Sequence, residues 1–86
     1  MKTIQELIDR IDEIAELSTI YARAPWTPES EAALKADPED ESNPFEKEGL
    51  EYLLEIFIAK EVLEPMSGAS SRDRCLRVIQ YAIHDA

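Results

Sequence analysis

This sequence has few cysteines, glycines and histidines, and it has no long apolar run. Cys75 is the only cysteine, so a disulfide within the chain is impossible and we expect a reducing, cytoplasmic environment. Its two glycines, Gly49 and Gly68, are too few and too far apart for a glycine-rich phosphate-binding loop. The longest apolar run spans only residues 56–59, whereas a membrane helix needs about 20 such residues. Acidic residues interrupt the N-terminal apolar positions, so we expect no signal peptide.

Side chains that could carry out catalysis are also scarce. The only histidine, His84, lies nine residues from Cys75, which is on the order of 13 Å along a helix, so the two do not make a nucleophile and base pair. Carboxylates at helical spacing lack the Glu-x-x-His pattern of di-iron sites, and residues 37–41 lack the glycine and terminal glutamate of a calcium loop. The sequence therefore predicts no metal, no cofactor and no enzymatic activity.

Positive charge is the other shortage, because 19 acidic residues outnumber 9 basic ones and the formal net charge is −10 over 86 residues. The excess of acidic residues is confined to residues 1–64, which contain 17 acidic and 6 basic side chains. Residues 65–86 contain 2 acidic and 3 basic side chains. Such a surface repels phosphate backbones and anionic lipids, so we expect no direct binding to nucleic acid or membranes. The charge favours a basic protein partner, and solubility is the competing interpretation of the same charge.

The first half of the chain changes from helical to alternating periodicity. Apolar residues recur at helical spacing behind a Thr3/Glu6 capping box, which predicts a helix over residues 3–17. Alternation over residues 19–23 and 31–37 predicts two strands joined by a proline-rich loop. A helix over residues 28–36 is the alternative for the second of them. The acidic segment 37–49, which contains two prolines and ends in a glycine, indicates a loop.

Residues 50–58 decide the fold class. As a strand, this segment places Leu50, Tyr52, Leu54 and Ile56 on one face. As part of one helix over residues 44–64 it has high helix propensity, and the chain would then be an all-α four-helix bundle. Periodicity alone does not distinguish the two. After a turn at residues 66–70, Ser70 or Ser71 caps a final helix; its expected apolar stripe is Cys75, Leu76, Val78, Ile79, Ala82 and Ile83.

Several short segments occur in an order that resembles a known family. They are the opening MKTIQELI, the pairs Ile20-Tyr21 and Trp26-Thr27, the AAL at 32–34, the acidic proline-containing loop and the GLEY at 49–52. They resemble small acidic bacterial domains, some of which are similar to immunity proteins that neutralise toxins. The resemblance brings no catalytic residues. It implies one α+β domain over residues 1–86, with an N-terminal helix, a three-stranded antiparallel sheet, and C-terminal helices on one sheet face.

These observations lead to one preferred function and two alternatives. We expect a toxin-neutralising protein of immunity or antitoxin type that occludes a basic toxin or nuclease domain. The alternatives are a structural module that forms homodimers or larger oligomers, and an inhibitor that mimics DNA. The expected contact surface combines the first helix with the 37–48 loop and a tryptophan that fills a pocket of the partner; its proposed contact residues are Trp26, Asp37, Glu39, Asp40, Glu41, Glu46 and Glu48.

Overall fold

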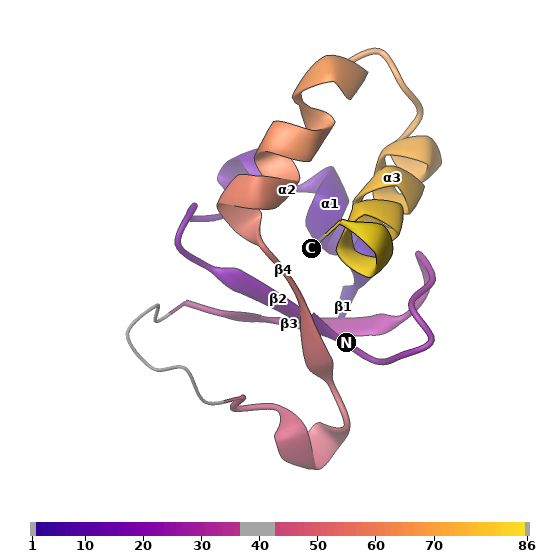
Figure 1. Cartoon of the computed structure of the whole chain (residues 1–86). Helices are drawn as coiled ribbons and strands as arrows, with labels where there is room; N and C mark the ends of the chain where they lie inside the picture. Colours follow the sequence, from indigo (N-terminus) through magenta and orange to yellow (C-terminus); the bar gives the residue numbers. More distant parts are fainter. Residues whose placement is uncertain (1, 37–42, 86) are drawn as a thin grey trace.

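The computed structural model describes residues 2–36 and 43–85, and it is an α+β fold in which the helices lie on one side of a four-stranded antiparallel sheet (Figure 1). The all-α alternative is therefore wrong. The described residues form, in chain order, β1 (Lys2–Thr3), α1 (Ile4–Asp9), the 3-10 turn η1 (Ile11–Glu13), β2 (Thr19–Ala22), β3 (Glu31–Lys35), the 3-10 turn η2 (Glu46–Glu48), β4 (Glu51–Glu55), α2 (Ile56–Leu63), the 3-10 turn η3 (Glu64–Met66) and α3 (Ser71–His84).

The first helix begins where its capping residue predicts and ends earlier than expected. The Thr3 hydroxyl accepts a hydrogen bond of 3.2 Å from the backbone N–H of Glu6, which satisfies one of the free amides of the first turn. The helix then stops at Asp9, so the predicted extent to Leu17 is wrong. Helical spacing continues through η1, which still buries Ile11, but the chain must leave the helix to enter β2 at Thr19. Pairing in the sheet has overridden local helix propensity here.

The sheet contains one strand more than the sequence predicts. Its order is β1-β3-β2-β4, with every neighbouring pair antiparallel. The strands predicted at 19–23 and 31–37 are present as β2 and β3, but β2 ends at Ala22 and β3 at Lys35, and residue 37 lies outside the described residues. The helical alternative for residues 28–36 is therefore wrong. The unexpected strand is β1, in which Lys2 lies opposite Ala32 and Thr3 opposite Glu31. Two residues are too few for any periodicity to be read.

The strand predicted over residues 50–58 is β4, and it is shorter than predicted. It ends at Glu55, and α2 begins at the next residue without a loop. Ile20 lies opposite Leu54 and Tyr21 opposite Tyr52, so Leu53 is an extra residue in β4. This bulge sends both Leu53 and Leu54 into the core and leaves Tyr52 exposed. The expected face shared by Tyr52 and Leu54 is therefore wrong.

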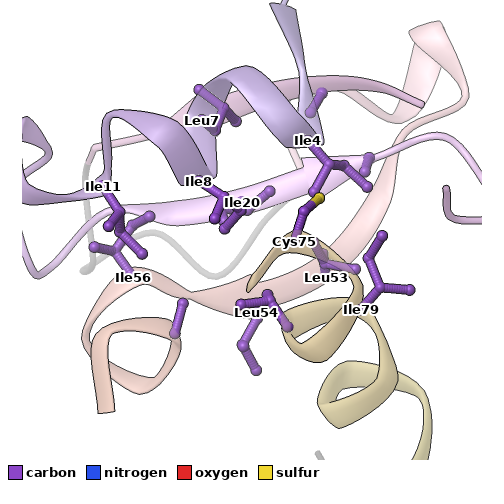
Figure 2. Close-up of a cluster of buried hydrophobic side chains, with 14 of the residues drawn as sticks. Ile4, Leu7, Ile8, Ile11, Ile20, Leu53, Leu54, Ile56, Cys75 and Ile79 are labelled. Atoms are coloured by element: carbon purple, nitrogen blue, oxygen red, sulfur yellow. The ribbon is translucent and has the colours of Figure 1, made fainter. Parts of the chain in front are cut away.

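The core lies between the sheet and the helices (Figure 2). Figure 2 shows Ile4 of α1 beside Cys75 of α3 and Ile8 of α1 beside Ile20 of β2, and Leu7 and Ile79 belong to the same buried cluster. Polar contacts also join these two helices, because the Ser71 hydroxyl donates to Asp9, and the Gln5 amide donates to the Ser71 hydroxyl at 2.6 Å. The predicted stripe of the last helix is too wide, since Leu76 and Ile83 are exposed.

The N-terminus of α3 gives the first testable prediction. The Ser70 hydroxyl accepts a 3.1 Å hydrogen bond from the backbone N–H of Asp73. We expect Ser70→Ala to lower the free energy of unfolding by about 1 kcal/mol, because one amide of the first turn loses its partner. Urea denaturation monitored by circular dichroism measures this loss. Ser67→Ala, which removes an exposed hydroxyl that caps no helix N-terminus, is the control, and an equal loss in both variants would contradict the capping role.

Candidate functional site

An acidic groove of about 490 Å³ lies between the η1 segment and α2. Two pairs of carboxylates from distant parts of the sequence meet in it: one pair belongs to η1 and the residues after it, and the other to α2 and η3. Apolar side chains from both elements lie among them, including Phe57, which is 39% exposed. The groove is lined by Ile11, Asp12, Glu16, Phe57, Lys60, Glu61, Leu63, Glu64, Ser67 and Arg74.

Two cations also line the acidic groove, and only one has a hydrogen-bond partner among the described residues. The Lys60 ammonium donates to the backbone oxygen of Ile14 at 3.1 Å, which ties α2 to the chain after η1. The Nε atom of Arg74 is buried and has no hydrogen-bond partner in the described parts of the chain. Because two cations face four carboxylates, the groove has an excess of negative charge and attracts cations.

Two ion pairs between described residues lie outside the acidic groove. Within residues 2–36 and 43–85, Arg23 pairs with Glu31 at 3.1 Å and Arg72 pairs with Glu29 at 2.8 Å. The hydrogen bond from Arg72 lowers the pKa of Glu29, but both side chains of this pair are exposed, so the contribution to stability is small. The four carboxylates of the acidic groove take part in neither pair. Their charge is available to a partner.

A second surface feature is an apolar hollow of about 400 Å³ beside Trp26. The hollow, called the Trp26 hollow below, is lined by Ala24, Pro25, Trp26, Glu51, Tyr52 and Ile83. Trp26 is partly buried against the core, and its indole N–H donates to the backbone oxygen of Ala22 at 3.1 Å. The Ser30 hydroxyl donates to the oxygen of Pro25 and so closes the loop that carries the tryptophan. The indole ring is therefore held in place before any partner arrives.

Tyr52 connects the Trp26 hollow to the sheet face that the helices do not cover. Its ring is edge-on to that of Tyr21, with centroids 6.1 Å apart, and Tyr21 is edge-on to Phe45 at 5.6 Å. The Tyr52 hydroxyl donates to Glu55 at 3.4 Å. Partial burial raises the pKa of Tyr52, and the negative charge of Glu55 raises it further. Tyr52 is still 47% exposed, so an aromatic surface remains open at the start of β4.

Of the residues predicted from the sequence as contacts, three lie within the described parts of the chain. Trp26 lies in the apolar hollow, while Glu46 and Glu48 are exposed on η2, which Figure 1 shows on the opposite side of the sheet from α1. Negative charge on the first helix and on η2 is thus separated by the sheet. The remaining predicted contacts lie outside the described residues; they are Asp37, Glu39, Asp40 and Glu41.

The sequence did not indicate that Asp12 and Glu16 meet Glu61 and Glu64. In the sequence, each of these two pairs of carboxylates lies among apolar residues, a pattern that is typical of any solvated helix face. Their meeting depends on α2 packing against η1, a contact between segments more than forty residues apart. Phe57 was also missed, because a residue in an apolar run gives no sign that its side chain will be left exposed.

Cys75 and His84, the two side chains considered above as a nucleophile and base, lie in different surroundings. Cys75 is fully buried, and burial raises the pKa of its thiol to about 12, which keeps it protonated and unreactive at neutral pH. His84 is exposed near the end of α3. Among residues 2–36 and 43–85, no group of three or more His, Cys, Asp or Glu side chains is placed to hold a metal ion. No helix in this part of the protein has the length and apolar character needed to cross a membrane.

Comparison of the chain with protein-family models, curated proteins and solved structures found no match.

Proposed function

We propose that this protein is a binding module that holds a basic protein, in the manner of an immunity or antitoxin protein, and that the acidic groove makes the principal contact. The observation that carries this proposal is the groove itself. It collects four carboxylates that take part in neither ion pair of the described residues, beside an exposed aromatic ring.

The groove chemistry suits an arginine or lysine side chain of the partner. A guanidinium placed over the exposed ring of Phe57 gains a cation–π contact. Glu61 of α2 and Glu64 of η3 line the same groove and can pair with its N–H groups. The net negative charge of the chain adds a long-range field that speeds the encounter. Binding of this kind would cover a basic active site by occlusion, without any chemical step.

The test uses each protein encoded beside this chain's gene as the probe, since toxins and their inhibitors are expected to be neighbours. We expect a basic neighbour to bind, and Glu61→Lys/Glu64→Lys to lower its association rate by about tenfold to a hundredfold. Stopped-flow fluorescence at several salt concentrations measures the rate. Both substituted residues are exposed, so the fold is retained and circular dichroism verifies this.

The matched control is Glu46→Lys/Glu48→Lys, which makes the same charge change on the other side of the sheet. We expect it to lower the rate less than the groove variant does. Equal losses of association rate in the two variants would mean that the rate depends on net charge alone, and would contradict the groove as the contact surface. Binding by none of the neighbours would contradict the proposal as a whole. Competition of duplex DNA for the same partner would show that the module covers a DNA-binding surface.

A further inference from the structure

The sheet has one long open edge. The strand order leaves β1 and β4 at the two edges, and β1 contains only two residues whereas β4 contains five. In the described parts of the chain, β4 pairs with β2 alone, and Figure 1 shows no further strand beside it. An unpaired edge presents N–H and C=O groups that an extended peptide can bind by adding a strand.

This edge joins the two surface features described above. Glu51 and Tyr52, at the start of β4, line the Trp26 hollow, and Phe57, two residues after its end, lines the acidic groove. Five residues of extended chain span about 17 Å. A single extended segment lying along β4 therefore reaches from the hollow toward the groove.

We propose that β4 and the Trp26 hollow together bind an extended segment of the basic partner, which adds to the sheet as a fifth strand and places one apolar side chain in the hollow. This inference rests on the proposed function, because it names the part of the basic partner that binds. The hollow supplies the apolar contact through Tyr52 and through Ile83, which is 55% exposed. The bulge at Leu53 interrupts regular pairing along the edge, so the hollow, more than the strand pairing, fixes the position of the segment.

The charge of the edge selects the occupant. Glu51 and Glu55 stand at the two ends of β4, so a segment with lysine or arginine opposite them is attracted. A second copy of this chain, paired antiparallel about the centre of β4, would place Glu51 of each copy opposite Glu55 of the other. Like charges directly opposite are destabilising. A basic segment therefore fits this edge better than a second copy does.

The test selects binders from random peptides displayed on phage, with the full chain as bait. We expect the enriched peptides to carry one apolar or aromatic residue flanked by lysine or arginine at alternating positions. Ile83→Asp is expected to weaken their binding by about tenfold, because it puts a charge into the hollow. Leu76→Asp is the matched control: Leu76 lies on the same helix, is 43% exposed, and is not part of the hollow. We expect Leu76→Asp to leave binding unchanged, and circular dichroism establishes that both variants fold.

Chemical-shift mapping with an enriched peptide then locates the site. Shifts at residues 51–55 and at the Trp26 indole N–H would support the inference. Shifts confined to the acidic groove, with Ile83→Asp binding as tightly as the unsubstituted protein, would overturn it and leave the proposed function standing. Enrichment of acidic peptides would overturn both. Failure to enrich any peptide would overturn the extended basic segment as the occupant. Self-association of the chain would also overturn it, if Ile83→Asp abolishes that self-association. Both conclusions hold whether or not a protein encoded beside this chain's gene binds.

Discussion

Leu54→Ala should lower the free energy of unfolding by about 2–5 kcal/mol, the range found when a large buried side chain is truncated and a cavity remains. Leu54 is 0% exposed and lies opposite Ile20, which is also fully buried. Both belong to the core between the sheet and the helices. Since domains of this size are stable by only roughly 5–15 kcal/mol, this one change removes a large share of the total. Urea denaturation followed by circular dichroism measures it.

The control for this prediction is Leu17→Ala, in which the same side chain is shortened at a position that is 65% exposed. We expect a change within about 0.5 kcal/mol, because little apolar surface leaves a packed environment. A loss at Leu17 as large as that at Leu54 would contradict the position of the core.

Stability should fall as the pH rises above about 9, with Cys75 as one cause. Burial raises the thiol pKa from 9.0 to about 12 in the folded protein. Between these values the unfolded chain releases the thiol proton while the folded chain keeps it, so the unfolded state binds fewer protons and stability decreases with pH. The slope is about 1.4 kcal/mol per pH unit, and the full loss approaches about 4 kcal/mol near pH 12.

Tyrosines also titrate in this range, so the measurement is the difference between the unsubstituted protein and Cys75→Ala. The variant is less stable at pH 7 because it leaves a small cavity, but it has no thiol to titrate. We expect the difference in unfolding free energy to shrink from pH 9 upward and to change sign once the loss from thiol ionisation exceeds the cost of the small cavity. A difference that stays constant with pH would contradict the raised pKa of the buried thiol.

Local signals in the sequence predicted the starts of α1 and α3 better than the end of α1 or the start of α2. The caps at Thr3 and Ser70 depend on residues three positions away, so the sequence alone identifies them. The end of α1 at Asp9 and the change from strand to helix at Ile56 depend on sheet pairing and packing instead. The bulge at Leu53 also depends on pairing, which is why alternation through β4 misplaced Tyr52 relative to Leu54.

The candidate site was less predictable than the fold. Trp26 could be singled out because two prolines flank a rigid aromatic ring, and its hollow also includes Tyr52 and Ile83 from distant elements. The composition indicated an acidic surface, but charge counts do not show which carboxylates come together. Glu61 and Glu64 line the same groove as Asp12 because α2 packs on η1. A single sequence contains no local pattern for such a contact.

The strand order has a consequence for the chain while it is being synthesised. Once Lys35 has left the ribosome, β1, β3 and β2 are all available to pair, because β4 adds only at the far side of β2. Their apolar side then lacks Leu53 and Leu54 of β4 and the buried side chains of α2 and α3, which belong to the same core. We therefore expect nascent chains released before α3 is made to expose this surface and aggregate, and the complete chain to reach its native state only after α3 has emerged.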